Sequence, residues 1–284
     1  MLVDLREILD IAEKNDYATG SFNTPNLECL NAVIDAAEGL GLPVIISHAE
    51  LHESVSPLTT IGPIMVEAAK KSKVPVCVHL DHCENLDYMK TALEIGFTGA
   101  MYDGSTLPYE ENLINTKKAV KLASGYKCGV EAELGALASR EGGHSHSEGG
   151  SGSAGPVYTD PDEAVAFCRE TGIDAFAPSF GTAHGIYKSK PMLDFERVRT
   201  IHERTGLPLV MHGGSGVSAE DYREGIRNGL RKINYYTYMS RAATLAVKDM
   251  LEKQDVTFFH DLALCAEKAM KADVEKAMKV FAGI

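Results

Sequence analysis

The chain has 284 residues, of which 44% are hydrophobic and 24% are charged, a composition typical of globular proteins that argues against disorder. Its formal net charge of −12 supplies no basic surplus to neutralise phosphates, which argues against nucleic-acid binding. No apolar run approaches the ~20 residues of a membrane span, the start lacks the apolar region of a signal peptide, and the six cysteines form no CxxC pair. We therefore expect a cytoplasmic protein with reduced thiols and no membrane partner, folded as a single domain over residues 1–284.

Strands and helices are expected to alternate along the chain. Apolar runs that end in polar residues predict eight strands, at 17–23, 43–47, 74–82, 97–103, 127–133, 173–180, 207–212 and 232–236. Apolar residues at helical spacing predict helices at 5–12, 26–40, 59–71, 84–96, 108–123, 160–171, 194–204, 218–228 and 241–253. Eight such alternations predict an α/β fold, a (β/α)₈ TIM barrel, with an open sheet as the alternative because periodicity does not show closure.

Two segments fall outside this alternation. Residues 138–155 are rich in glycine and lack apolar periodicity, and they follow the end of the fifth strand. Loops of this length in a barrel are usually functional, so we expect a mobile active-site loop that closes over the substrate, with a plain surface insertion as the alternative. The C-terminal extension at about 258–284 carries an extra amphipathic helix, which packs either on its own barrel or on a neighbouring subunit.

The stretch His79-Leu80-Asp81-His82-Cys83 closes the third strand. Catalytic residues of TIM barrels lie at the carboxyl ends of the strands. We expect His82 to be a metal ligand and Asp81 to be a proton carrier. The plainer interpretation is a polar strand end with a packed histidine.

Other strand ends bring further imidazoles and carboxylates to the same face. Three histidines, His82, His184 and His212, are a common way to hold a catalytic Zn²⁺ with one position left open for substrate. Asp103 and Glu133 are expected to orient these rings through their second nitrogens. We expect His79 to point into the barrel or to support a ligand. The remaining candidates, His48, His52, His202 and His260, are expected in loops or helices as surface or packing residues.

Two stretches favour phosphate binding. His212-Gly213-Gly214-Ser215-Gly216 leaves a strand and precedes a helix, so bare backbone N–H groups can approach an anion. The eighth strand ends in Asn234-Tyr235-Tyr236-Thr237, just before another helix. In TIM barrels the loops after strands seven and eight often form a phosphate site.

Five motifs together resemble the class II, zinc-dependent fructose-bisphosphate/tagatose-bisphosphate aldolase family. They are His79-Leu80-Asp81-His82, Tyr102-Asp103-Gly104-Ser105 with Pro108-Tyr109-Glu110-Glu111-Asn112, Val130-Glu131-Ala132-Glu133-Leu134-Gly135, Gly181-Thr182-Ala183-His184-Gly185 and His212-Gly213-Gly214-Ser215-Gly216. They keep the order of the family over about residues 1–255. The resemblance implies a Zn²⁺ enzyme that reversibly cleaves a ketose phosphate or bisphosphate to dihydroxyacetone phosphate and an aldehyde, as a homodimer or homotetramer.

The resemblance also implies roles for individual residues. By position, His82, His184 and His212 match the zinc ligands, Asp81 matches the residue that exchanges a proton with the C4 hydroxyl, and Asp103 and Glu133 match acidic residues near the metal. Gly185, Gly213, Ser215 and Asn234 match positions around the ketose phosphate and a bound monovalent cation (Na⁺ or K⁺), and Asn23 and Ser47 match substrate-contacting strand ends. Glu141 falls where the family has its mobile-loop acid–base glutamate, with Glu148 as its competitor.

Departures from the family pattern concern the aldehyde half of the substrate. In Asn234-Tyr235-Tyr236-Thr237-Tyr238 tyrosines occupy both positions that are usually acidic, and Cys83 stands where glycine is common. No residue is a clear candidate to bind a distal phosphate, so the aldehyde is expected to differ from glyceraldehyde 3-phosphate. The alternatives are a metal-dependent sugar-phosphate isomerase or epimerase and a non-catalytic barrel that binds a phosphorylated ligand.

Overall fold

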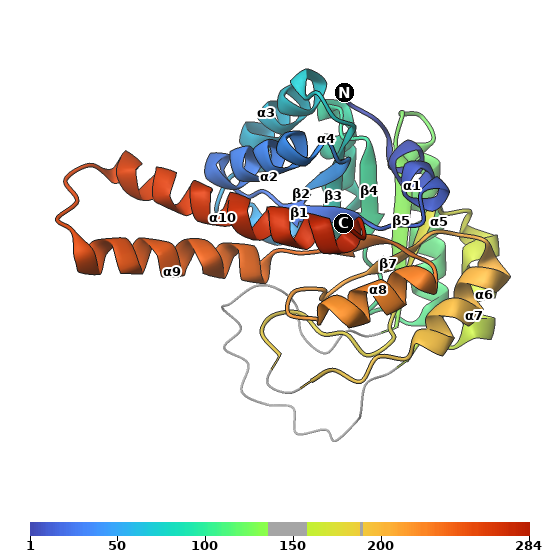
Figure 1. Cartoon of the computed structure of the whole chain (residues 1–284). Coiled ribbons are helices and arrows are strands. Elements are labelled where there is room, and N and C mark those ends of the chain that lie inside the picture. Colours follow the sequence, from blue (N-terminus) through green and yellow to red (C-terminus); the bar gives the residue numbers. More distant parts are fainter. Residues whose placement is uncertain (136–157, 188–189) are drawn as a thin grey trace, which may run out of the picture.

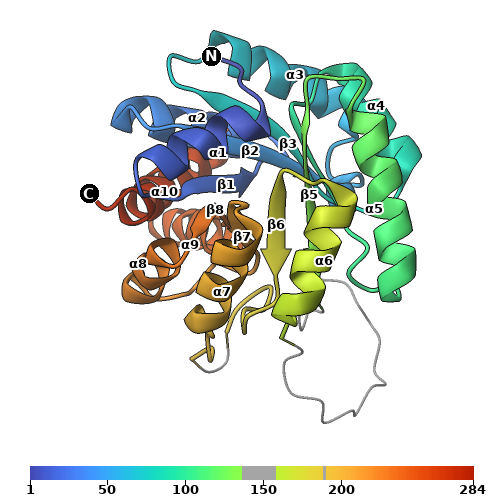
Figure 2. The ribbon, with the colours of Figure 1, turned by 90° about the vertical axis from the view of Figure 1, so that its right-hand side faces the viewer.

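The protein folds as a closed barrel of eight parallel strands surrounded by helices (Figures 1 and 2). The computed structural model describes residues 1–135, 158–187 and 190–284. Each strand pairs with its neighbours in sequence, and β1 also pairs with β8, which closes the ring. The strands are β1 (Thr19–Asn23), β2 (Val44–Ala49), β3 (Val76–Cys83), β4 (Gly99–Tyr102), β5 (Gly129–Leu134), β6 (Ala175–Pro178), β7 (Leu209–Met211) and β8 (Leu230–Asn234).

Helices follow the strands and cover the outside of the barrel (Figure 2). They are α2 (Leu27–Leu40), α3 (Leu58–Lys71), α4 (Leu86–Ile95), α5 (Tyr109–Ala123), α6 (Pro161–Thr171), α7 (Phe195–Thr205) and α8 (Ala219–Arg227), with a short 3₁₀ helix η1 (Glu50–His52) between β2 and α3. The predicted TIM barrel is therefore confirmed. The eighth strand ends at Asn234 rather than at residue 236, because its ladder with β1 stops at the pair Ser21–Asn234.

Side-chain caps fix where several helices begin, close behind the loops at the carboxyl ends of the strands. Asn85 accepts the N–H groups of Asp87 and Tyr88 at the start of α4, and Ser218 accepts the N–H of Asp221 at the start of α8. Such caps satisfy N–H groups that have no partner within the helix. The ends of the loops are thereby held in place.

Alternating side chains along each strand divide the barrel into an outer apolar core and a layered interior. On β3, Val76, Val78 and Leu80 belong to the large cluster between strands and helices, whereas Cys77 packs in a small cluster inside the barrel. Strand residues two apart share a face, so His79 and Asp81 follow Cys77 into the interior, where both are buried. The interior is thus apolar at the amino ends of the strands and polar at the carboxyl ends.

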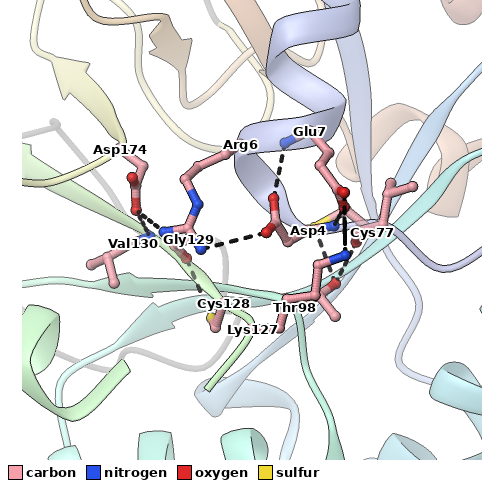
Figure 3. A network of polar contacts seen from close by, with 11 residues as sticks. Asp4, Arg6, Glu7, Cys77, Thr98, Lys127, Cys128, Gly129, Val130 and Asp174 are labelled. Carbon is pink, nitrogen blue, oxygen red and sulfur yellow. Dashed lines mark hydrogen bonds and ion pairs between the residues drawn. The ribbon is translucent and has the colours of Figure 1, made fainter. Parts of the chain in front are cut away.

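Helix α1 (Leu5–Lys14) covers the amino end of the barrel and contributes Leu5, Ile8 and Leu9 to the interior apolar cluster. Polar contacts tie this helix to the strands (Figure 3). Arg6 donates to Asp174 (3.2 Å), and the same carboxylate oxygen of Asp174 accepts the N–H of Val130 (2.7 Å). This end of the barrel is therefore sealed, and ligands must approach from the opposite end.

The last two helices form an arm that leaves the barrel (Figure 1). Helix α9 (Thr237–Lys253) and helix α10 (Phe259–Phe281) are antiparallel neighbours, and only the second half of α10, from Met270 onward, is buried against the barrel. This confirms the extra C-terminal helix. Helix α9 begins at Thr237, four residues before the predicted start. None of the described helices is long and apolar enough to cross a membrane.

Candidate active site

The third strand ends in an irregular turn that presents two neighbouring side chains at the carboxyl end of the barrel. The pairing of β3 with β4 shifts register between Leu80 and Cys83, and His82 has a φ of 45°, a left-handed conformation that is uncommon outside glycine. Consecutive side chains of a regular strand point to opposite faces, and a bulge re-aims one of them. Asp81 therefore stays in the interior while the next residue, His82, joins the other two candidate ligands.

Three histidines from distant parts of the chain meet at this end. His82 comes from β3, His184 from the segment after β6, and His212 from the end of β7. The ring centroids lie 4.5 Å (His82–His212), 5.0 Å (His82–His184) and 6.0 Å (His184–His212) apart, and one ring nitrogen of each lies within 4.8 Å of those of the others. Three imidazole nitrogens leaving one side open match a catalytic metal centre.

A carboxylate holds the ring of His82. Nδ1 of His82 lies 2.8 Å from Oδ2 of Asp103, whose other oxygen accepts the N–H and the hydroxyl of Ser105 (3.1 and 2.6 Å). Burial lowers the pKa of His82, but the carboxylates of Asp81 and Asp103 outweigh burial and raise it to about 9. Without a metal the ring of His82 is therefore protonated near pH 7. Asp103 holds the proton on Nδ1, so Nε2 is the nitrogen that can bind a metal, which would displace its proton.

A second carboxylate holds the ring of His212 by its opposite nitrogen. Nε2 of His212 lies 2.8 Å from Oε1 of Glu131, and Nδ1 lies 3.1 Å from Nδ2 of Asn234. An amide N–H donating to Nδ1 requires a lone pair there, so the proton sits on Nε2. Nδ1 is the nitrogen that could bind a metal, which would then replace the N–H of Asn234. Sequence reasoning missed Glu131. The signal was its position two residues before Glu133 on the same strand.

A buried ion pair supports Glu131. Nζ of Lys232 lies 2.9 Å from Oε2 of Glu131 and also donates to Oδ1 of Asn234 (2.8 Å). Nε2 of His79 lies 3.6 Å from the same glutamate oxygen, and burial followed by the charge of Lys232 lowers the pKa of His79 to about 3. His79 therefore points into the barrel, as expected, as a neutral ring. Sequence reasoning also missed Lys232, although it shares a strand face with Asn234.

Asp81 is held by two amides. Its carboxylate oxygens accept Nδ2 of Asn23 (3.1 Å) and Nδ2 of Asn234 (3.0 Å). Burial raises the pKa of Asp81, but the nearby His82 and Lys232 outweigh burial and hold it far below its usual range. The group is an oriented, ionised carboxylate beside the three histidines.

Carboxylates make a second possible cation centre around His82. Oxygens of Asp103 and Glu133 and a ring nitrogen of His82 lie within 4.8 Å of one another. Asp103 orients His82, and the carboxylate of Glu133 helps to raise the pKa of that histidine. Two overlapping groups of side chains at this end of the barrel could therefore hold a cation, and His82 belongs to both.

The loop after β7 has the form of an anion cradle. Gly213 has a φ of 63°, and a Cβ there would collide with the backbone of Ala183. A Cβ on Gly214 would lie 2.6 Å from the carbonyl oxygen of Asn234. Only glycine fits at these two positions, because the backbone of Ala183 and of Asn234 already occupies the space that a Cβ would need. The hydroxyl of Ser215 accepts the N–H of Tyr236 (3.1 Å), which joins this loop to the end of β8.

Tyr187 holds the segment of His184 against the same loop. Its hydroxyl accepts the N–H of Ala183 (2.8 Å) and donates to the carbonyl of Gly213 (2.8 Å). Gly185 lies between them in the chain with a φ of 95°. Sequence reasoning missed this positioning role because nothing in the local pattern marks it.

Of the remaining residues predicted to bind substrate, Ser47, Tyr236 and Thr237 lie at this end of the barrel, whereas the side chain of Tyr235 does not. Ser47 pairs with Asn23 in the β1–β2 ladder, and its hydroxyl lies 2.8 Å from that of Ser21. Tyr236 and Thr237 follow β8 beside the loop after β7. Tyr235, however, packs its ring against Phe22 and Phe281 and donates its hydroxyl to Asp273 (2.9 Å), so its side chain belongs to the core under α10.

Two histidines lie in other surroundings than their sequence context indicated. His48 belongs to β2 and is buried, with Nε2 3.1 Å from the hydroxyl of Tyr88. His52 ends η1 and is buried against Tyr236, with ring centroids 5.3 Å apart. The expected loop 138–155, with Glu141 and its competitor Glu148, lies wholly outside the described residues.

Comparisons with known proteins agree with this geometry. The family model described as "Fructose-bisphosphate aldolase class-II" matches residues 3–283. Among curated proteins, a fructose-bisphosphate aldolase of Staphylococcus aureus is 37% identical over 285 residues, covering 99% of this chain and 97% of the relative. A 6-phospho-5-dehydro-2-deoxy-D-gluconate aldolase of Halalkalibacterium halodurans is 36% identical over 286 residues, covering 99% and 96%.

A solved structure with the same fold is the YdjI aldolase from Escherichia coli K12. It superposes with a TM-score of 0.86 at 36% sequence identity and covers 99% of this chain and 97% of its own. Because 99% of this chain is covered, the match includes the arm formed by α9 and α10 as well as the barrel.

Proposed function

The chain belongs to the class II fructose-bisphosphate aldolase family, and from this premise we propose that it is a zinc-dependent ketose-phosphate aldolase. The reaction is the reversible cleavage of a ketose phosphate or bisphosphate to dihydroxyacetone phosphate and an aldehyde. The observation that carries the proposal is the set of three histidine nitrogens within 4.8 Å of one another, next to the oriented carboxylate of Asp81.

The donor set supports zinc as the metal. Three neutral imidazoles are a typical ligand set of catalytic Zn²⁺, and the partners of His82 and His212 assign the tautomers that such binding needs. A bound Zn²⁺ would act as a Lewis acid toward the carbonyl of the donor substrate. His82, His184 and His212 would hold the ion, and Asp103 and Glu131 would keep two of the rings in place.

Asp81 is the group we assign to the proton of the C4 hydroxyl. Being ionised, it can accept that proton in the cleavage direction and return it in the synthetic direction. The amides of Asn23 and Asn234 hold both carboxylate oxygens, so the base is oriented before substrate arrives. We assign the proton on the carbon of dihydroxyacetone phosphate to Glu141, from its sequence position alone, with Glu148 as the competitor.

The ketose phosphate is assigned to the loop after β7 and the start of α9. Gly213 and Gly214 let this loop pack closely against the segment of His184 and the end of β8, and Ser215 supplies a hydroxyl. Gly185 lies beside this loop through the contacts of Tyr187. We assign a monovalent cation, Na⁺ or K⁺, to the same region, where it would balance part of the phosphate charge.

The first experiment measures exchange of deuterium into dihydroxyacetone phosphate, followed by proton NMR, with metal-loaded and chelated protein. Exchange that disappears on chelation and returns with Zn²⁺ is the expected result, because the donor half-reaction needs the metal but no aldehyde. A matched His212→Ala protein, which lacks one ligand, should show no recovery. Absence of exchange by the zinc-loaded protein would refute the assignment, and isomerised or epimerised products without carbon–carbon cleavage would indicate the other enzyme class.

We propose further that the protein is a homo-oligomer, a dimer or tetramer, assembled through the arm. Helix α9 buries only Met239, and apolar side chains on the arm are open to solvent, with Leu245 54% and Phe259 80% exposed. A cavity of about 460 Å³ lies where the arm joins α2. Helix α9 packs chiefly on α10, and the outer part of the arm leaves apolar side chains uncovered. A second copy of the arm is the self-complementary surface that would cover them.

Light scattering tests this assembly. We expect Leu245→Glu to shift the protein toward the monomer, because it places a charge in the proposed contact. The matched control Ile114→Glu changes a comparably exposed residue on α5 (52%) and should leave the mass unchanged. A wild-type protein of monomeric mass would contradict the proposal.

We also propose a reducing, cytoplasmic location. All six cysteines are free, and five of them are buried. Such unpaired thiols are typical of proteins kept in a reducing compartment.

A further inference from the structure

Two aromatic rings form a wall beside Asp81 at the carboxyl end of the barrel. In the β2–β3 ladder Ala49 pairs with Asp81, and η1 starts at the next residue, so His52 lies just beyond this strand end. Its ring packs edge-on against Tyr236, with centroids 5.3 Å apart, and Tyr236 is tied by its N–H to Ser215. We call His52 and Tyr236 the rim wall; it joins β2 to β8.

His52 carries a polar atom with no evident structural use. The residue is only 6% exposed, and its Nδ1 has no hydrogen-bond partner within the described part of the chain. A buried polar atom without a partner is costly, so a ligand that supplies one gains affinity. Burial lowers the pKa of His52 more than the carboxylate of Asp81 raises it, so the ring is neutral near pH 7 and offers one donor and one acceptor.

A chain of contacts behind the wall keeps His52 in position. The hydroxyl of Tyr88 donates to Oε2 of Glu53 (2.6 Å), so Nε2 of His48 must be the donor in its 3.1 Å contact with that hydroxyl. His48 is thus fixed, and its ring lies edge-on to His52 at 6.4 Å. Side chains locked in this way form a binding surface rather than a loose loop.

The charges around the wall indicate what it can bind. The charged groups that act on His48 and His52 from neighbouring elements are the carboxylates of Glu53 and Asp81. A phosphate here would meet negative charge and no balancing cation from these partners. Hydroxyl groups, in contrast, suit a neutral imidazole and the face of a tyrosine.

We propose that His52, with Tyr236, binds hydroxyl groups of the aldehyde half of the substrate and selects uncharged hydroxyaldehydes over aldehyde phosphates. The inference rests on the proposed aldolase function and adds the acceptor class to it. The donor phosphate is assigned to the loop after β7, which meets the rim wall only at Tyr236, through Ser215. His52 lies beyond Tyr236, just past the end of β2, so the aldehyde half that reaches Asp81 has His52 as its neighbour.

The test compares aldehyde acceptors with dihydroxyacetone phosphate as the donor. For the wild type we expect a higher kcat/KM with D-glyceraldehyde than with glyceraldehyde 3-phosphate. His52→Ala should lower kcat/KM for D-glyceraldehyde tenfold or more, because a site built to hydrogen-bond a hydroxyl loses most when that bond is lost. The same variant should change kcat/KM for propanal, which has no hydroxyl, and deuterium exchange into dihydroxyacetone phosphate less than threefold.

Two further variants make the outcome decisive. His52→Gln keeps an amide donor and acceptor and should recover part of the loss, and His260→Ala, an exposed histidine on the arm, should behave as the wild type. If His52→Ala lowered kcat/KM for propanal and the rate of deuterium exchange as much as kcat/KM for D-glyceraldehyde, His52 would only support the fold. A higher wild-type kcat/KM with glyceraldehyde 3-phosphate than with D-glyceraldehyde would overturn the proposed acceptor class. A wild type that exchanges no deuterium would refute the aldolase function itself, and this inference with it.

Discussion

Single side chains at the site are held in pairs, each polar group by another buried group. Asp103 fixes one nitrogen of His82, and Glu131 fixes one nitrogen of His212. Because hydrogen bonds to a ring nitrogen decide which nitrogen carries the proton, two of the three candidate ligands are set in their binding tautomer before any ion arrives. The order of the site is therefore a property of the chain itself and does not have to be created by the metal.

The first prediction concerns Asp81. We expect Asp81→Asn to lower aldol cleavage by about 10²–10⁴-fold, the usual contribution of a positioned acid–base group, because an amide cannot accept the hydroxyl proton. Deuterium exchange into dihydroxyacetone phosphate should persist, since it involves no aldehyde. A variant that keeps normal cleavage rates in a coupled assay would exclude Asp81 from the reaction.

The second prediction concerns the buried pair of Lys232 and Glu131. Lys232→Met leaves the glutamate charge in the interior without its cation and should lower the free energy of unfolding by about 3–5 kcal/mol, measured by urea denaturation. The double variant Lys232→Met/Glu131→Gln removes both charges and should recover much of this loss. Equal destabilisation by the single and double changes would show that the pairing is energetically unimportant.

At the scale of elements, the strand ends could be predicted and the strand interiors could not. Apolar runs that stop at polar residues located His82, His212 and Asp103, because parallel strands bring all their carboxyl ends to one edge. Glu131 and Lys232 were not predicted as site residues, because charged residues within a strand are ordinarily assigned to a solvent-exposed face. In a closed barrel they can instead face the interior.

The elements whose roles were misread were decided by tertiary contacts. His52 looked like a loop residue because η1 has no periodic pattern, but it is buried, with its ring against Tyr236 and beside His48. Tyr235 and Tyr236 were predicted to extend the eighth strand because aromatic residues favour strands. Strand β8 nevertheless ends at Asn234, opposite Ser21, although β1 continues to Asn23. Local sequence carries neither fact.

The third prediction concerns the attachment of α1 to the strands. Asp174→Ala removes the acceptor of the Val130 N–H and should cost about 1–3 kcal/mol in the free energy of unfolding. Asp174→Asn keeps an acceptor but loses the ion pair with the half-exposed Arg6, which is worth at most ~1 kcal/mol, so its loss should be smaller. Equal losses in chemical denaturation would contradict this ranking.

At the scale of the whole molecule, the site depends on closure of the ring. Its side chains come from β1, β2, β3, β5 and β8 and from the segments just after β4, β6 and β7, so they meet only when the barrel is complete. We propose that residues 1–284 fold as one unit, and that binding at the site is coupled to the stability of the whole barrel.

The fourth prediction follows from this coupling. Chelation should lower the midpoint of thermal unfolding in a single transition, because an ion that binds only the folded state stabilises it by about 2.7 kcal/mol at one hundred times its dissociation constant. Zn²⁺ should restore the midpoint of the wild type but not that of His212→Ala. Calorimetry that shows no shift on chelation would argue against a metal bound by these histidines.

The fifth prediction concerns acid stability of the metal-free protein. Burial, followed by the neighbouring His52, lowers the pKa of His48 from 6.5 to about 4. Between these values the unfolded chain binds a proton that the folded chain does not, so stability falls as pH falls from 6.5 to 4, by up to about 1.4 kcal/mol per pH unit from this group. Urea unfolding of His48→Gln should show a shallower pH dependence over that window; an unchanged slope would contradict the assignment.

The contrast between the interior network and the rim wall bears on how such an enzyme can diverge. Inside the barrel, Lys232 holds both Glu131 and Asn234, so a single replacement in this network is penalised until a second one compensates for it. His52 is backed by His48, but no partner within the described chain depends on its Nδ1. With the acceptor role that we propose for His52, related enzymes should therefore retain the interior network together, while a single replacement at His52 should be enough to change which aldehyde is preferred.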